Sequence, residues 1–213
     1  MKTEQTNFWE GEFGKEYTDR NTFNHDGLNN YYLTNYGVSK DEMNKEFLGG
    51  LDRNIKILEV GCNIGMQLNA LQKMGFTNLS AIDLQEYAVK KALELTNGIH
   101  IIQGSGFEIP FGDNSFDLVY THGVLIHISP SDLSKIMGEM NRVSSKYIWG
   151  FEYYNDEIKQ INYRGHDGFM WKGDYSGLFQ KQTPTLKIVK KNLYPYITEQ
   201  NKGNTDCMYL LSK

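Results

Sequence analysis

The sequence contains only two cysteines, Cys62 and Cys207, and they are too far apart to show the short spacing of metal ligands. This indicates neither a disulfide framework nor a zinc site, so we expect no metal. No apolar run approaches the about eighteen residues of a membrane-spanning helix, and the polar N-terminus lacks the apolar core of a signal peptide. We therefore expect a cytoplasmic protein that does not insert into membranes.

An excess of positive charge is also missing. The chain has 22 Lys and Arg residues against 26 Asp and Glu residues, which gives a net charge of −4. A protein that binds nucleic acid through phosphates usually presents a basic surface, so this class of partner is disfavoured. Aromatic residues are plentiful, with 14 tyrosines. Tyrosines often line polar ligand pockets, although half-buried packing explains any single one equally well. The oligomeric state is not indicated.

Apolar runs typical of strands alternate with helical patterns in most of the chain. The expected strands are 56–60, 79–83, 99–103, 116–121, 147–151, 185–193 and 206–212, and the expected helices are 66–74, 85–95 and 129–143. This alternation predicts a single α/β domain with a doubly wound, mostly parallel, seven-stranded sheet. We divide the chain into a helical region (1–54), a cofactor-binding core (55–151), an insert (152–184) and C-terminal strands (185–213).

The segment "ILEVGCNIG" (57–65) is typical of a buried strand that ends in a glycine turn before a helix. A dinucleotide fingerprint needs a second glycine where this chain has Asn63, and a phosphate-binding loop would end in Gly-Lys-Ser/Thr. Asp83 lies 22 residues beyond Gly61, at the end of the next strand, where a carboxylate can bind ribose hydroxyls. A ligand with a ribose and no pyrophosphate fits best, and the most common example is S-adenosylmethionine.

Residues 56 to about 150 resemble the core of class I S-adenosylmethionine-dependent methyltransferases, in "ILEVGCNIG", "AIDL" and "GSGFEIPFGDNSFDLVYTHGVLIHI". The resemblance implies a Rossmann-like fold, a glycine loop under the methionine part of the cofactor, and an acid on the ribose. Where the family often has an acid beside the adenine, this chain has Ser105. The cofactor-binding residues predicted here are Glu59, Gly61, Cys62, Gly65, Asp83, Leu84, Ser105, Gly106, Phe107, Thr121 and Arg20.

A narrower resemblance covers nearly the whole chain. The segments "FWEGEFGKEYTDRN" (8–21), "GVLIHISP" (123–130) and "INYRGHDGFMWKGDY" (161–175) are similar to the pseudaminic acid biosynthesis-associated methylases. These are small bacterial enzymes found with surface-sugar pathways, and their substrate is inferred from that context. The resemblance implies an acceptor from bacterial surface polysaccharide or capsule synthesis. We expect the N-terminal segment to form a helical lid that excludes water from the reaction.

Methyl transfer is an in-line displacement that needs the acceptor about 3 Å from the methyl group, and a base only if the acceptor loses a proton. His122, after the fourth predicted strand, is the first candidate for a base or hydrogen-bond donor, and His127 is its rival. Tyr17 of the lid is a third candidate catalytic residue. A packing role is the alternative for each histidine, and an anionic acceptor would need no base.

The insert is rich in residues that bind anions. The predicted substrate-binding residues are Tyr153, Tyr163, Arg164, His166 and Lys172. Arg offers a bidentate fork and Lys a mobile charge, so together they suit a carboxylate or phosphate, although a solvated loop would also carry such residues. We predict O-methylation of a small anionic, sugar-like or phosphorylated metabolite.

Three alternatives to this prediction stay open. The first is methylation of a phosphorus oxyacid of the phosphonate or phosphoramidate type. The second is an NAD-dependent sugar oxidoreductase or epimerase, which Asn63 and the lack of a Tyr-x-x-x-Lys pair disfavour. The third is a non-catalytic protein that binds the cofactor.

Overall fold

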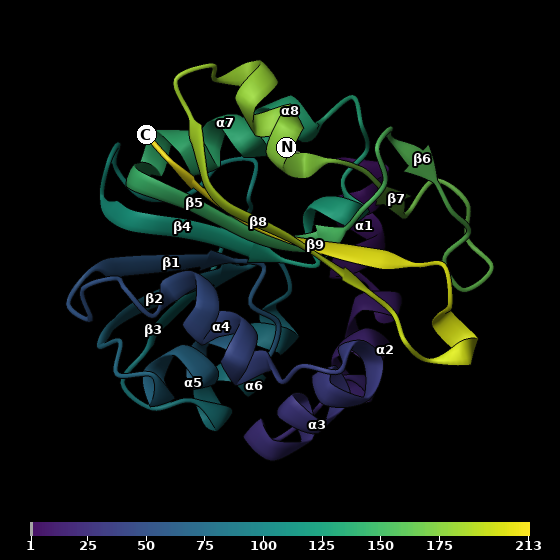
Figure 1. Cartoon of the computed structure of the whole chain (residues 1–213), viewed down its shortest axis with the longest axis horizontal. Helices are drawn as coiled ribbons and strands as arrows, with labels where there is room; N and C mark the ends of the chain where they lie inside the picture. Colours follow the sequence, from purple (N-terminus) through teal and green to yellow (C-terminus); the bar gives the residue numbers. More distant parts are fainter. Residues whose placement is uncertain (1) are drawn as a thin grey trace.

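The computed structural model describes residues 2–213. A seven-stranded sheet in the order β3-β2-β1-β4-β5-β9-β8 runs through the centre of the molecule (Figure 1). Its strands are β1 (Lys56–Val60), β2 (Asn78–Asp83), β3 (His100–Gln103), β4 (Phe116–His122), β5 (Ser144–Tyr153), β8 (Lys187–Pro195) and β9 (Thr205–Ser212). The strands from β3 to β5 are all parallel, whereas β9 is antiparallel to both β5 and β8. The predicted doubly wound, mostly parallel α/β sheet is therefore confirmed.

Helices cover both faces of this sheet. The N-terminal region forms α1 (Glu4–Glu10), α2 (Glu12–Arg20), α3 (His25–Tyr36) and α4 (Lys40–Leu48). The later helices are α5 (Met66–Lys73), α6 (Glu86–Leu95), α7 (Leu133–Val143) and α8 (Tyr175–Gln182), with short 3-10 turns η1 (Leu125–His127) and η2 (Glu199–Asn201). In Figure 1, α4, α5 and α6 lie on one face, and α7 and α8 lie on the other. No helix within residues 2–213 is both long and apolar enough to cross a bilayer.

Alternation along the strands produces two separate cores. In β1, Ile57 packs on the α4–α5 side with residues such as Met43 and Leu68, and Leu58 packs on the α7 side with residues such as Met140. Both side chains are fully buried. A parallel strand covered on both faces needs such a continuous apolar run, and this is why the run predicted a strand so clearly.

The predicted helix 129–143 begins later than expected. Its apolar face is buried as predicted, but the helix starts at Leu133. Ser129 accepts backbone hydrogen bonds from Asp132 and Leu133 at 2.8 and 3.2 Å, so these residues form a turn before the helix. The Ser129 and Ser131 hydroxyls lie 2.9 Å apart within that turn, so the Ser129 side chain does not cap the helix.

The insert after β5 contains more regular structure than its polar composition suggested. A short hairpin of β6 (Lys159–Gln160) and β7 (Trp171–Lys172) projects beyond the main sheet, and α8 follows it (Figure 1). Lys159 pairs with Lys172 and Gln160 with Trp171. The Trp171 side chain is buried, which anchors this hairpin against the rest of the protein.

Candidate cofactor and acceptor site

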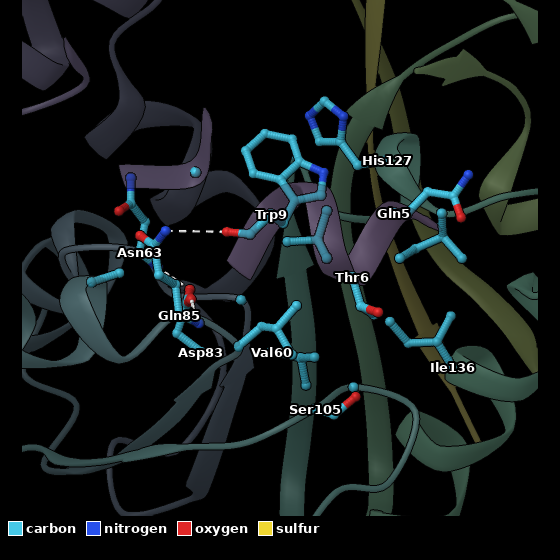
Figure 2. A pocket seen from close by; sticks show the side chains of 18 of the residues that line it. Gln5, Thr6, Trp9, Val60, Asn63, Asp83, Gln85, Ser105, His127 and Ile136 are labelled. Carbon is cyan, nitrogen blue, oxygen red and sulfur yellow. Dashed lines mark hydrogen bonds between the residues drawn. The ribbon is translucent and has the colours of Figure 1, made fainter. Parts of the chain in front are cut away.

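A pocket lies at the carboxyl ends of the central strands, beneath the N-terminal helices (Figure 2). Its volume is about 160 Å³, whereas a single water needs roughly 10–15 Å³, so an organic ligand of many atoms fits. The sheet and its loops contribute Val60, Gly61, Asn63, Asp83, Leu84, Gln85, Gly104, Ser105, Gly106, Phe107, His122, Gly123, Val124, His127 and Ile128. Helices α1 and α2 contribute Gln5, Thr6, Trp9, Gly14, Tyr17 and Thr18, and α6 and α7 contribute Ala88 and Ile136.

The glycine turn after β1 has an unusual backbone. Gly61, Asn63 and Gly65 all have positive φ angles, of 80°, 46° and 78°. Asn is one of the few residues with a side chain that tolerates this region. A Cβ on Gly61 would lie 2.6 Å from Val124 Cγ2, so glycine lets the turn approach the loop after β4. The turn therefore places its backbone directly at the pocket.

Asp83 holds this turn in place while it lines the pocket. Its Oδ2 accepts a hydrogen bond from the Asn63 backbone N–H at 2.7 Å, and its Oδ1 accepts one from the Gln85 N–H at 2.9 Å. Each carboxylate oxygen keeps a further lone pair that a ligand hydroxyl can use. Burial raises the pKa of Asp83, and backbone N–H groups of Gln85, Asn63 and Leu84 oppose that shift. The turn and the acid thus form one unit.

The turn after β3 forms another wall of the pocket. Phe107 N donates to the Ser105 hydroxyl at 3.2 Å, so this hydroxyl stabilises its own turn. A Cβ on Gly106 would lie 2.7 Å from Ile136 Cδ1 and 3.0 Å from Val60 Cγ1. Gly106 therefore allows the turn to pack tightly between α7 and β1 on the ligand side of the sheet.

Helices α1 and α2 are fastened to the sheet by polar side chains. The Gln85 amide donates to the Trp9 carbonyl oxygen at 3.1 Å (Figure 2) and to that of Gly11 at 3.2 Å. The Thr18 hydroxyl lies 2.9 Å from Asn63 Oδ1. A Cβ on Gly14 would be only 1.9 Å from the Trp9 carbonyl oxygen. The two helices therefore cross closely over the pocket.

The N-terminal helices also pack against the insert through aromatic rings. Phe8 stacks on Phe13 and Phe169 with ring centroids 4.0 and 4.1 Å apart, and Gln5 donates to the Gly168 carbonyl at 3.0 Å. The ring centroids of Tyr163 and Phe13 are 5.7 Å apart. Two segments far apart in the sequence thus form one cover beside the pocket.

His122 contacts two ionisable groups. Its Nε2 is 2.6 Å from the Tyr32 hydroxyl and 3.4 Å from Lys40 Nζ. Burial lowers the pKa of His122 well below its usual value, and the nearby Lys40 charge lowers it further. The ring is therefore neutral at physiological pH.

His127 lies in a different environment. Its Nδ1–H donates to the Phe169 carbonyl at 2.8 Å, which leaves Nε2 unprotonated in the neutral ring. Burial lowers the pKa of His127 to about 4. The His127 ring lies beside Trp9 (Figure 2), with ring centroids 4.5 Å apart, and its centroid is 5.1 Å from that of Tyr163. His127 therefore joins the aromatic cover, whereas His122 lines the pocket from the sheet side and contacts Tyr32 and Lys40 through Nε2.

The pocket brings many of the predicted residues together. Those that line it are Tyr17, Gly61, Asp83, Leu84, Ser105, Gly106, Phe107, His122 and His127. Burial raises the pKa of Tyr17, so its hydroxyl stays protonated and acts as a donor rather than a base.

Five predicted cofactor contacts lie outside the lining. Glu59 points away from the pocket because strand alternation places it with Ile57, where its Oε2 accepts from the Tyr120 hydroxyl at 2.8 Å. Arg20 is exposed and pairs with Glu16 at 3.1 Å. Cys62 and Thr121 are buried, and a Cβ on Gly65 would face Thr96 and Ala92. These residues support the turn or the sheet instead of lining the pocket.

The predicted substrate residues of the insert do not converge on the pocket either. Arg164 and His166 are exposed in a turn where Arg164 has a positive φ of 51°. Lys172 is half-buried, donates to Asn204 Oδ1 and lies 5.8 Å from the Tyr153 ring. Tyr163 contacts the cover. Lys172 therefore remains the better-placed cation of the predicted pair.

Several site residues were missed by sequence reasoning. Thr18 and Gln85 fasten the cover to the sheet, and Tyr32 and Lys40 contact His122. Gln85 follows Asp83 by two residues, so its position after the second strand is a signal that could have been read. Nothing local marks Lys40, which reads as an ordinary polar residue at a helix start.

A comparison with known protein families finds a match within the central part of the sheet. Residues 58–146 match the family model described as a methyltransferase domain. The match covers less than half of the chain, so it shows that this segment is similar to methyltransferase domains. The predicted cofactor, S-adenosylmethionine, agrees with this match and with the names of two structural neighbours. The comparisons do not show the narrower resemblance to the pseudaminic acid biosynthesis-associated methylases. They support a methyltransferase in general.

Curated relatives match only part of the chain. A sterol 24-C-methyltransferase of Gibberella zeae is 30% identical over 129 residues, which is 54% of this chain and 33% of that protein. An uncharacterised protein of Haemophilus influenzae is 32% identical over 101 residues, or 45% of this chain and 40% of that protein. The chain thus spans only about a third of the length of the sterol enzyme.

Solved structures share the fold over more of the chain. A protein from Pyrococcus horikoshii has a TM-score of 0.67 and 16% identity, and the match covers 92% of this chain and 94% of that one. An S-adenosylmethionine-dependent methyltransferase of Methanosarcina mazei has a TM-score of 0.63 at 16% identity, covering 78% and 95%. A Burkholderia thailandensis N1-methyltransferase solved with S-adenosylhomocysteine has a TM-score of 0.63 at 14% identity, covering 81% and 76%.

Proposed function

We propose that this protein transfers the methyl group of S-adenosylmethionine to a small acceptor in the pocket beneath α1 and α2. The observation that carries this proposal is Asp83. Both its oxygens are aligned by backbone N–H groups while the carboxylate lines the pocket, as a ribose-binding acid requires. The Gly61 turn then receives the methionine end of the cofactor, and the turn around Gly106 receives the adenine. This leaves the sulfonium methyl on the side of His122.

The acceptor that we propose is a small anionic, sugar-like or phosphorylated metabolite. Support comes from the insert, where half-buried Lys172 lies over the Tyr153 ring. Burial lowers the pKa of Lys172, and Asp206 opposes this shift, so an incoming anion would strengthen its charge. A phosphorus oxyacid presents the same chemistry and is the second candidate. The tie to surface polysaccharide synthesis rests on the sequence resemblance alone.

Sterol methylation and dinucleotide binding fit this site less well. The sterol enzymes are named for a sterol acceptor, whereas the polar acceptor that we propose suits Tyr17 at the pocket and Lys172 on the insert. A dinucleotide would need a glycine at Asn63, whose side chain here contacts Thr18. The proposal therefore keeps S-adenosylmethionine and a polar acceptor.

Ligand binding and methyl transfer test the two halves of this proposal separately. In calorimetry, S-adenosylmethionine and S-adenosylhomocysteine should each bind one per chain, and NAD should not bind. The protein is then incubated with methyl-labelled cofactor and a panel of sugar phosphates, acidic sugars, phosphonates and phosphoramidates, with neutral sugars as the matched controls. Label should enter an anionic acceptor. Tight binding of NAD alone, or equal labelling of the neutral sugars, would contradict the proposal.

A further inference from the structure

Lys40 is buried with no acidic side chain of the described residues at ion-pair distance. It is the first residue of α4, is 0% exposed, and makes no ion pair within the described residues 2–213. Its Nζ lies 4.8 Å from the centroid of the Tyr32 ring and 4.7 Å from that of Phe151. Its polar contact is His122 Nε2, at 3.4 Å. A lysine that only supported the fold would be expected to keep its ammonium group in water.

This environment brings the titration of Lys40 close to neutral pH. Burial lowers the pKa of Lys40 to about 7, while Glu59 and Asp206 oppose the shift. The titratable groups facing it are Tyr32 on α3, His122 on β4, Glu59 on β1 and Asp206 on β9. A buried lysine with such a pKa spends much of its time as a neutral amine, which has a lone pair and can accept a proton.

The orientation of the His122 ring decides what Lys40 can do. Nε2 is engaged with Tyr32 and Lys40, so Nδ1 is the ring nitrogen left for the pocket that His122 lines. A neutral imidazole carries its proton on one nitrogen only. For Nδ1 to act as a base, Nε2 must hold the proton and donate it to a neighbour. The Tyr32 oxygen and the neutral Lys40 amine are the two acceptors within reach.

We propose that Lys40 is a positioning residue that keeps His122 Nδ1 free as a base and receives the proton from Nε2, so that the methylated group is a protonated oxygen such as a hydroxyl. This inference rests on the proposed methyl transfer. An anionic oxygen would need no base, so the acceptor anion serves for binding and a separate hydroxyl takes the methyl group.

The step balances in atoms and charge. The acceptor oxygen forms a bond to the methyl carbon, the carbon–sulfur bond breaks, and its electron pair returns to sulfur to give S-adenosylhomocysteine. The hydroxyl proton moves to His122 Nδ1, and the Nε2 proton moves to the Lys40 amine. The products are the methyl ether, the neutral thioether and a Lys40 ammonium, so the positive charge of the sulfonium ends on Lys40.

Nuclear magnetic resonance of the full chain tests whether Lys40 sets the position of the His122 proton, and it needs no acceptor. Protein labelled with ¹⁵N-histidine and bound to S-adenosylhomocysteine is compared with Lys40→Met and with Lys45→Met, an exposed lysine on the same helix as a matched control. At pH 8, wild type and Lys45→Met should carry the His122 proton on Nε2. In Lys40→Met the proton should shift towards Nδ1, and the His122 pKa should rise because the nearby charge is gone. An unchanged His122 signal in Lys40→Met would overturn the inference.

The pH profile of methyl transfer is a second test of the role of Lys40. With a hydroxyl acceptor from the panel, kcat should rise through pH 7 in wild type, as Lys40 loses its proton. The rise of kcat with pH should disappear in Lys40→Met. At pH 8, kcat should be reduced at least tenfold and KM should change little. Lys40→Arg, which stays charged, should be inactive throughout while still binding S-adenosylhomocysteine. If transfer occurs with wild-type kcat in Lys40→Met, the inference is wrong and the proposed function stands. If no acceptor is labelled, the proposed function fails while the resonance result still decides the role of Lys40.

Discussion

Asp83 performs two tasks with one carboxylate. It fixes the backbone of Asn63 and Gln85 and presents its remaining lone pairs to the pocket. A cofactor-binding acid that also organises its own turn loses both functions when it is removed, and the loss should appear as weaker cofactor binding.

Asp83→Ala should weaken binding of both S-adenosylmethionine and S-adenosylhomocysteine by about 1.5–3 kcal/mol, the scale of lost charge-assisted hydrogen bonds. Titration calorimetry measures this. Glu59→Gln is the matched control, since Glu59 does not line the pocket. Equal losses in the two variants would mean that the site has been placed at the wrong carboxylate.

Lys172 is the cation we assign to the acceptor. Lys172→Met should lower kcat/KM for an anionic acceptor about tenfold or more and leave cofactor binding near wild type, because the lysine lies on the insert. Lys159→Met is the control, as Lys159 is the exposed residue that pairs with Lys172 across the hairpin. Steady-state kinetics would contradict the assignment if Lys159→Met were the more damaging change.

At the scale of elements, the strands were predicted well and the cover only in part. The run 57–65 predicted both a buried strand and its turn, because apolar composition and left-handed glycines are local properties of the chain. The contacts of Lys40 and Gln85 depend on which helix packs over which strand, and no local pattern encodes that. The cations of the insert were expected to converge, but the exposed turn at Arg164 and the hairpin at Lys172 separate them.

The crossing of α1 and α2 should control the pocket. Gly14→Ala would place a methyl group 1.9 Å from the Trp9 carbonyl, so the helices must separate. We expect at least tenfold weaker S-adenosylhomocysteine binding and a melting temperature close to wild type, because the strands begin only at Lys56. Asn7→Ala, an exposed change on α1, should alter neither value. Wild-type affinity in Gly14→Ala would show that these helices do not close the site.

At the scale of the whole molecule, buried acids should make stability depend on pH. Asp206 accepts from the hydroxyls of Tyr36 and Tyr196, and burial raises its pKa to about 7. The folded state therefore holds a proton between about pH 4 and 7 that the unfolded state releases. The stabilising contribution is complete below the unfolded pKa and is lost as pH rises through 7.

Asp206→Asn removes this titration while its amide oxygen can still accept from both tyrosines. Denaturant unfolding at pH 5, 6 and 7 should show wild type losing stability relative to the variant as pH rises. A constant difference between the two proteins across this range would mean that Asp206 does not hold a proton in the folded state.

The most direct test of the account is a crystal structure of the full chain with S-adenosylhomocysteine. We predict the ribose hydroxyls within hydrogen-bonding distance of Asp83, the homocysteine end at the Gly61 turn, the adenine beside Gly106, and the sulfur facing His122. A ligand bound outside this pocket, or one whose ribose does not touch Asp83, would contradict the account.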